Sequence, residues 1–172
     1  MVKFSSAKDA ACEVTTKELH LLVFPQKLKE GTRAIASHPE EEFMKGVISW
    51  PGEYDFDGIF FKGIGQSDGS QVSYVADIEG VRCAFVDAPL QEWSDSDIEK
   101  LGAVDVLLVM PDKEKAVREF IETVDPRVII FPGTGDTAAI LKALGESAET
   151  VSEIKIQSGS LPQDTRKVVV LK

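Results

Sequence analysis

Two histidines, His20 and His38, are the first side chains to consider for metal or acid–base chemistry. His38 precedes Pro39 and three consecutive glutamates, whereas His20 begins an apolar segment. A zinc site needs several nitrogen, sulfur or oxygen ligands that converge on one point. A lone histidine before a proline is more typical of a solvated loop, and His20 is more typical of a strand face. Neither residue by itself indicates a catalytic centre.

Two cysteines, Cys12 and Cys83, lie far apart in apolar text that resembles strands. Such residues usually act as small buried hydrophobic side chains, so we expect neither a disulfide nor a metal clip. With only two histidines and buried thiols, no Ser-His-Asp or Cys-His arrangement for nucleophilic catalysis is indicated.

Three aspartates, Asp87, Asp112 and Asp136, follow apolar segments at or close to their ends. Ligands of layered α/β proteins gather at such strand ends, and a hard cation such as Mg²⁺ or Ca²⁺ binds carboxylates. Aspartate is also a common helix cap, and we favour that role for Asp112 and Asp136.

Residues 131–136, FPGTGD, form a glycine-rich turn between a predicted strand and a predicted helix. Backbone N–H groups at such a turn can bind a small anion, which leaves open a role as an anion sensor. The segment lacks the Lys and Ser/Thr of a phosphate-binding P-loop and the longer spacing of a dinucleotide fingerprint, so the signal is weak.

The first half of the chain is predicted to be a meander of antiparallel strands. Its segments are short, rich in β-branched or aromatic residues, and separated by turn residues. Glu79 and Gly80 mark a tight hairpin within it. The predicted strand segments are 11–14, 19–24, 32–37, 46–50, 58–64, 73–78 and 81–86.

The second half of the chain indicates a strand-helix-strand unit. Residues 104–111 and 126–133 are apolar runs of strand length, typical of strands covered on both faces. Between them, apolar side chains recur from Val117 to Val124 at helical spacing. A shorter helix is predicted after Ser94, which can cap it; another is predicted to end at Gly145, and strands follow to the C-terminus.

Length and charge limit the classes of protein. The 172 residues are sufficient for one domain, residues 1–172. A formal charge of −10, from 19 basic and 29 acidic residues, disfavours nucleic acid as a partner. The chain shows neither an apolar run of membrane-spanning length nor the apolar core of a signal peptide, so we expect no membrane association and a cytoplasmic location.

The corner Pro51-Gly52-Glu53-Tyr54 and the residues after it raise a family resemblance. Residues 50–64, WPGEYDFDGIFFKGI, resemble a characteristic corner of the small single-domain branch of the metallo-β-lactamase fold, a group of predicted zinc-dependent hydrolases. Further segments similar to that branch are residues 11–25, 81–109, 126–133 and 161–171. The resemblance implies a four-layer αββα sandwich, in which two packed mixed β-sheets are flanked by helices.

The resemblance also implies two metal ions at one edge of the sandwich, held by about five histidines and a bridging aspartate. His38 matches the first ligand of the family's metal-binding loop, and Asp87 matches the bridging aspartate. Other residues occupy the remaining ligand places or flank Asp87: Glu40, Glu42, Phe43, Ala84, Val86 and Gly133. The metal site is therefore predicted not to be intact, with His38 and Asp87 as its residual positions.

These observations lead to a functional hypothesis: a degenerate metallo-β-lactamase-fold protein that acts as a non-catalytic binding or assembly module. No cofactor is expected, and the partner would be an unknown protein or a second copy. The alternative is a hydrolase of unknown substrate that uses one zinc or other divalent ion through Asp87, His38 and nearby glutamates. If the first hypothesis holds, side chains such as Ala84 and Phe43 should fill the former site.

Overall fold

The computed structural model describes residues 1–133 and 135–172, which form two β-sheets and three α-helices. The six-stranded sheet has the order β13-β1-β2-β3-β4-β5. Its strands are β1 (Val2–Ser5), β2 (Cys12–Thr15), β3 (His20–Val23), β4 (Ala34–Ile35), β5 (Val47–Ile48) and β13 (Glu153–Ile156). The eight-stranded sheet has the order β12-β14-β11-β10-β9-β8-β7-β6. Its strands are β6 (Gly52–Phe56), β7 (Ile59–Gln66), β8 (Gln71–Ile78), β9 (Val81–Val86), β10 (Val106–Val109), β11 (Val128–Pro132), β12 (Glu149–Val151) and β14 (Lys167–Leu171).

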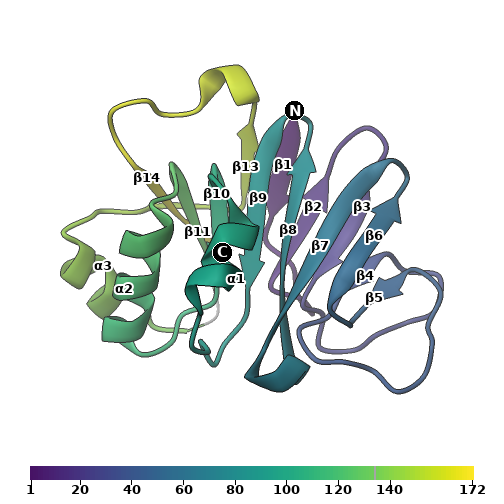
Figure 1. The fold of residues 1–172 in the computed structure, drawn as a ribbon. Helices are drawn as coiled ribbons and strands as arrows, with labels where there is room; N and C mark the ends of the chain where they lie inside the picture. Colours follow the sequence, from purple (N-terminus) through teal and green to yellow (C-terminus); the bar gives the residue numbers. More distant parts are fainter. Residues whose placement is uncertain (134) are drawn as a thin grey trace.

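The two sheets face each other across one apolar core (Figure 1). Inward side chains of both sheets, among them Phe4, Leu21, Phe61 and Phe85, are almost fully buried there. Both sheets contain parallel and antiparallel pairs, so the prediction of two packed mixed sheets is confirmed.

The predicted antiparallel pairing is confirmed for β2 with β3 and for β7 to β9, but it is wrong for β4 and β5. Strands β1 and β6, which also pair antiparallel with their neighbours, were not among the predicted segments. Strand β4 runs parallel to β3, and β5 runs parallel to β4. A parallel pair requires a connection that crosses back to the end of the sheet at which the preceding strand began. Residues 24–33 form this connection before β4, and residues 36–46 form it before β5.

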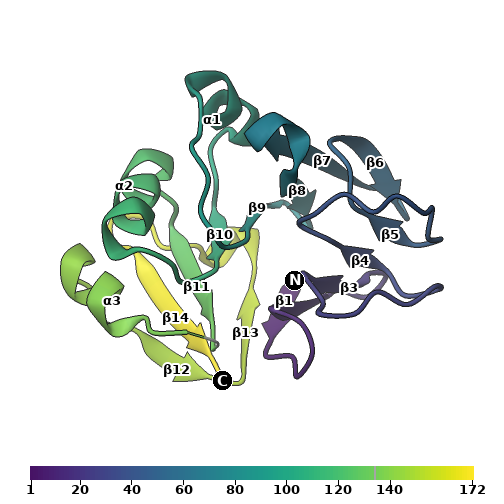
Figure 2. The same ribbon diagram turned by 90° about the horizontal axis from the view of Figure 1, so that it is seen from below.

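The helices α1 (Asp95–Leu101), α2 (Glu114–Val124) and α3 (Ala138–Leu144) all pack on the outer face of the eight-stranded sheet (Figure 2). The described residues place no α-helix on the outer face of the six-stranded sheet. This arrangement has three layers, where four were expected. The reason lies in the outward residues of β1 and β2, which are polar and provide no apolar stripe for a helix: Lys3, Ser5, Glu13 and Thr15.

Local signals in the sequence set the helix boundaries and one hairpin as predicted. Ser94 Oγ accepts a hydrogen bond of 3.1 Å from the N–H of Asp97, and Gly102 ends α1. Glu79 and Gly80 turn β8 into β9 with φ values of 53° and 75°, as a type I′ hairpin requires. In α2 the apolar face predicted from the sequence is buried against the sheet.

The two aspartates predicted to cap helices differ in their roles. Asp136 Oδ1 accepts a hydrogen bond of 2.9 Å from the N–H of Ala138 at the start of α3, as expected. Asp112 does not cap α2, because its Oδ2 accepts a hydrogen bond of 2.7 Å from the N–H of Leu90. Asp112 therefore holds the loop after β9 and not the helix that follows it.

The corner at Trp50 and Pro51 is a scaffold feature. It packs over Gly63 and Gly65 of β7, where an added Cβ would lie 2.8 Å from the Trp50 carbonyl oxygen and 2.9 Å from Pro51 Cγ. Gly52 adopts a φ of 144°, which other residues rarely adopt. These glycines allow a close approach of the two chain segments.

Tyr74 on β8 joins the two sheets through the core. Its ring is fully buried, and its hydroxyl lies 2.6 Å from the carbonyl oxygen of Ala36 and 3.2 Å from that of Ile48. Ala36 and Ile48 belong to the six-stranded sheet or directly follow it. Burial raises the pKa of the Tyr74 phenol, which keeps it protonated as a donor. Of the helices in the described part of the chain, none is long and apolar enough to cross a membrane.

The first prediction concerns the Tyr74 hydroxyl. Tyr74→Phe should lower the free energy of unfolding by about 1–3 kcal/mol, because it leaves the buried Ala36 carbonyl without this donor. Tyr54→Phe is the matched control, since the Tyr54 hydroxyl bonds the Trp50 carbonyl near the surface at 2.9 Å. Urea denaturation of both variants measures the difference. An equal decrease in the free energy of unfolding for both variants would show that the buried hydrogen bond of Tyr74 contributes no more than the surface hydrogen bond of Tyr54.

The second prediction concerns the buried thiols. Burial raises the pKa of Cys12 to about 12 and also raises that of Cys83. A thiol in the unfolded chain has a pKa near 8.5. Below about pH 8.5 the thiols therefore contribute their full stabilisation to the fold. This contribution decreases as the pH rises toward the pKa values of the folded state. The free energy of unfolding should fall above about pH 8.5, and less steeply in the double variant Cys12→Ala, Cys83→Ala. Identical pH slopes in both proteins would contradict it.

Candidate functional site

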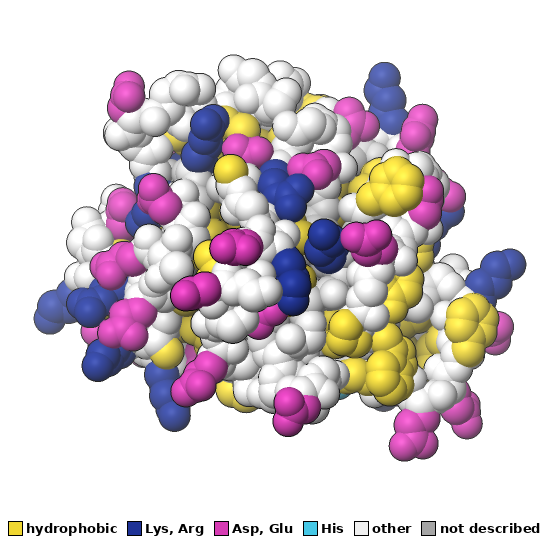
Figure 3. Space-filling view, viewed as in Figure 1, with side chains coloured by type: hydrophobic (Ala, Val, Ile, Leu, Met, Phe, Trp, Pro, Cys, Tyr) yellow, Lys and Arg dark blue, Asp and Glu magenta, His cyan; other side chains and the backbone are white. Residues whose placement is uncertain are grey.

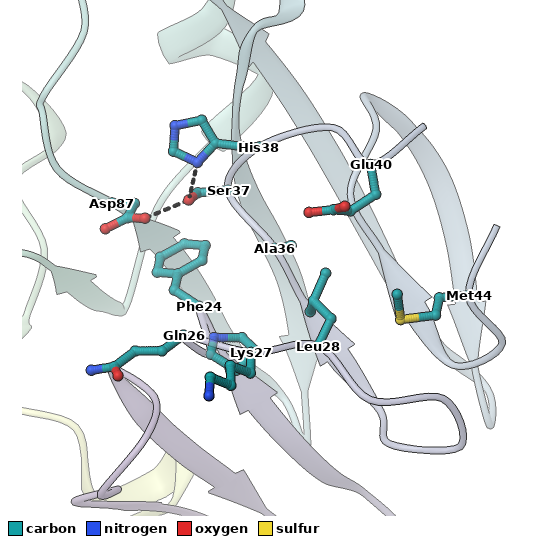
Figure 4. Close-up of a pocket in the computed structure, with 11 residues that line it drawn as sticks. Phe24, Gln26, Lys27, Leu28, Ala36, Ser37, His38, Glu40, Met44 and Asp87 are labelled. Atoms are coloured by element: carbon teal, nitrogen blue, oxygen red, sulfur yellow. Dashed lines mark hydrogen bonds between the residues drawn. The ribbon is translucent and has the colours of Figure 1, made fainter. Parts of the chain in front are cut away.

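The residual positions His38 and Asp87 lie in one pocket of about 620 Å³. The walls come from the loop after β3, the loop after β4 and the end of β9 (Figure 4). Phe24, Leu28 and Met44 supply apolar surface, and polar side chains line several other parts of the wall. Three separate strand ends thus bring together residues that are distant in the sequence.

Ser37 connects the two residual positions. Its hydroxyl donates a short hydrogen bond to Asp87 Oδ2, and its Oγ lies 3.0 Å from His38 Nδ1. Because a hydroxyl has one hydrogen, the His38 Nδ1–H is then the donor to Ser37. The other oxygen of Asp87 accepts a hydrogen bond of 2.8 Å from the N–H of Ala88.

This chain of hydrogen bonds is not a catalytic triad. In a Ser-His-Asp triad the imidazole lies between the other two groups and accepts the serine proton. Here the serine lies in the middle and donates its proton to the carboxylate. His38 therefore has no serine to activate as a nucleophile, and the arrangement orients side chains instead of transferring a proton to or from a substrate.

Some of the remaining family ligand places lie away from this cluster. Glu40 lines the same pocket, but on the opposite side from Asp87 (Figure 4). Glu42 and Phe43 lie outside the pocket, and the Phe43 side chain is 92% exposed. Ala84 is buried under the helices, on the face of β9 that points away from the six-stranded sheet.

The expectation that Ala84 and Phe43 fill the former site is therefore wrong. Side chains alternate along a strand, so Ala84 points to the opposite face from Phe85 and from Asp87 beyond the strand end. The loop after β4 directs Phe43 into solvent. Ser37 and Phe24 occupy the region instead (Figure 4).

Gly133, the place of the family's final histidine, has no room for any side chain. An added Cβ would lie 2.2 Å from the carbonyl oxygen of Leu171 and 2.8 Å from Lys172 Cγ. The first of these contacts is with backbone, which cannot rotate away. Strand β14 is thus packed against this position too closely for a metal ligand.

The donor set does not fit the two-metal site that the fold family implies. Within residues 1–133 and 135–172, no group of three or more His, Cys, Asp or Glu side chains is placed to hold a metal ion. His38 and Asp87 are two donors, and both already bond Ser37. Zinc sites take three or four protein ligands, so the chemistry of a dinuclear hydrolase has no support in these residues.

Two residues of the site were missed by sequence reasoning, Ser37 and Gln71. Gln71 Nε2 donates to the carbonyl oxygens of Asp87 at 3.3 Å and of Pro89 at 3.1 Å, so β8 holds the loop that carries Asp87. The position of Ser37 directly before His38 was the only signal in the sequence. For the FPGTGD segment, Thr134 lies outside the described residues, and the anion hypothesis stays untested.

Comparison of the structure with solved structures establishes the fold. A predicted zinc-dependent hydrolase of the metallo-β-lactamase superfamily from Thermotoga maritima superposes with a TM-score of 0.76 at 18% identity, over 100% of both chains. Igni18, a metallo hydrolase from the archaeon Ignicoccus hospitalis, gives 0.57 at 12% identity over 84% of this chain and 90% of its own. A variant of the β-hydroxylase CmlA gives 0.61 at 8% identity over 99% of this chain and 52% of its own.

The chain therefore has the metallo-β-lactamase fold, as the resemblance implied. Searches with the sequence against protein-family models and against curated proteins find no match. The likeness is one of structure, and at 18% identity or less it extends to the fold alone.

The third prediction tests the packing at Gly133. Gly133→Ala should destabilise the protein by about 1–3 kcal/mol or more, because the methyl group collides with the Leu171 carbonyl. Gly159→Ala is the matched control, since nothing lies within 4 Å of an added Cβ there. Thermal melting of both variants measures the effect. A Gly133→Ala protein as stable as the control would show that β14 yields easily and that a side chain fits.

Proposed function

We propose that this protein is a cytoplasmic, non-catalytic binding or assembly module that keeps the metallo-β-lactamase scaffold without its metal site. The observation that carries the proposal is the Ser37 hydroxyl, which bonds both residual ligand positions, His38 and Asp87. These side chains therefore form hydrogen bonds with one another. No cofactor is part of this proposal.

The energetics support it. Asp87 accepts hydrogen bonds from Ser37 and from the Ala88 N–H, so its carboxylate is stabilised without a metal ion, and hydrogen bonds to charged groups contribute about 1.5–3 kcal/mol each. A metal ion would bind here only with several further ligands that converge on it. Position 133 has no room for a side chain, and Phe43 points into solvent. The described residues therefore offer too few ligands.

A second candidate is a hydrolase with one divalent ion, and one observation favours it. His38, Glu40 and Asp87 all line the same open pocket, so a rearranged loop would give three donors. In this arrangement the ion would supply Lewis-acid chemistry when bound. The two candidates differ in whether the protein retains a metal ion through purification.

The fourth prediction separates these candidates by metal content. Untagged protein incubated with zinc or manganese and desalted should contain far less than one metal ion per chain, as measured by inductively coupled plasma mass spectrometry. Its melting temperature should not change with a chelator, because no ligand set is available to stabilise the fold through metal binding. Asp87→Asn should have the same metal content as wild type.

The control for this measurement is Asp164→Asn, which removes one exposed carboxylate away from the pocket. A stoichiometric metal ion that is present in wild type and Asp164→Asn, absent in Asp87→Asn, and removed together with thermal stability by the chelator would refute the module. That result would establish the single-metal candidate.

A further inference from the structure

A second hollow lies on the other side of the loop that carries Glu40. We call it the aromatic groove; its volume is about 330 Å³, and it is lined by residues 40–44, Val47, Ile48, Ser49, Trp50 and Tyr54. It lies where both sheets end, because β5 is the last strand of one sheet and β6 is the last strand of the other. Neither edge has a further strand beside it in the described part of the chain.

Two large aromatic side chains at this groove are in water. Phe43 is 92% exposed and Trp50 is 53% exposed. In Figure 3 hydrophobic side chains gather at the right of the molecule, the side on which Figure 1 places β5 and β6. A hydrophobic patch with a polar rim is typical of an interaction site, and aromatic anchors contribute much of the energy at such sites.

The groove is preformed by hydrogen bonds. The N–H of Glu40 donates to Ser49 Oγ at 3.0 Å, and Trp50 Nε1 donates to the Glu40 carbonyl oxygen at 2.9 Å. The Tyr54 hydroxyl donates to the Trp50 carbonyl oxygen at 2.9 Å. The start of the loop at Glu40 and the indole ring of Trp50 are therefore held in place before any partner arrives, which lowers the entropy cost of binding.

The charge at the rim identifies the chemistry of the partner. Three consecutive glutamates at residues 40–42 line the groove, and none of them forms an ion pair with the described residues. The nearby acids Glu53 and Asp57, in contrast, are paired with Lys62 and Arg33. A basic partner would complement the free carboxylates and stack its cations on the indole ring.

A second copy of this chain fits the groove poorly. Most homodimers are two-fold symmetric, so each groove would meet the same groove with its three glutamates. Like charges brought together in this way oppose association, and the net charge of −10 adds to the repulsion.

We propose that the aromatic groove binds a linear segment of another protein in which lysine or arginine flanks a large apolar residue. The apolar residue packs between Phe43, Met44 and Trp50, and the basic side chains face residues 40–42. This inference names the partner class of the proposed binding module and rests on that function.

The fifth prediction is a selection for peptides. Random dodecapeptides displayed on phage are panned on the whole protein in chelator, and enriched sequences should combine lysine or arginine with a large apolar residue. Synthetic copies should bind wild type with a Kd that rises with salt. Phe43→Ser should raise that Kd about tenfold or more, because it removes the main apolar anchor. Glu41→Lys should raise it and flatten the salt dependence.

Phe60→Ser is the matched control, since Phe60 is 70% exposed but lies outside the aromatic groove. It should leave the Kd unchanged. The proposal is overturned if nothing is enriched over bare support, if the enriched peptides are acidic, or if Phe43→Ser and Phe60→Ser bind equally well. Sedimentation equilibrium provides a further test, since a dimer that Phe43→Ser dissociates would assign the groove to a second copy.

The peptide selection and the metal measurement fail independently. Chelator is present throughout, and neither Phe43 nor Glu41 lines the pocket of His38 and Asp87. If the protein retains metal and also binds basic peptides, the proposed loss of the metal site is refuted, but the proposal for the aromatic groove is supported. If the protein contains no metal and does not bind these peptides, the proposed binding module is not contradicted, but the proposal that the aromatic groove binds basic segments is refuted.

Discussion

The contact between β8 and the segment that follows β4 is the constraint on which the site depends. The Tyr74 hydroxyl reaches through the core to the Ala36 carbonyl oxygen, and the N–H of Val72 donates to the Ser37 carbonyl oxygen at 2.7 Å. The same strand holds the Asp87 carbonyl through Gln71. One strand thus places Ser37 and Asp87 opposite each other, and their hydrogen bond follows from that placement.

The arrangement of side chains in the pocket of His38 and Asp87 follows from this contact. Because Ser37 is held facing Asp87, its hydroxyl satisfies the carboxylate and orients the His38 ring. At the end of β11, the backbone of β14 occupies the space that a ligand side chain at Gly133 would need. A metal ligand at position 133 would therefore require movement of backbone as well as a new side chain.

Most of the fold could be predicted from the sequence because local signals agree with it. The Glu79 and Gly80 hairpin, the Ser94 cap and the amphipathic α2 each have a physical cause within a few residues. The fourth layer was expected from the family resemblance alone, whereas the polar outward residues of β1 and β2 provide no surface for it. The parallel pairing of β4 and β5 depends on contacts between distant segments, which short patterns do not encode. For the same reason His38 and Asp87 could be nominated from sequence, whereas Ser37, which joins them, could not.

The loop after β4 contributes to both hollows of this region, the pocket of His38 and Asp87 and the aromatic groove. Its first part, with Ser37 and His38, is held by β8, while Glu40 is pinned to Ser49 and Trp50. Between Glu40 and the Met44 carbonyl, which accepts from the N–H of Val47, the side chains project outward and are free of the core. A loop fixed at both ends presents its exposed residues in a defined arrangement. The hydrogen bonds at the two ends of the loop therefore limit how far its aromatic and acidic side chains can move relative to the two sheets.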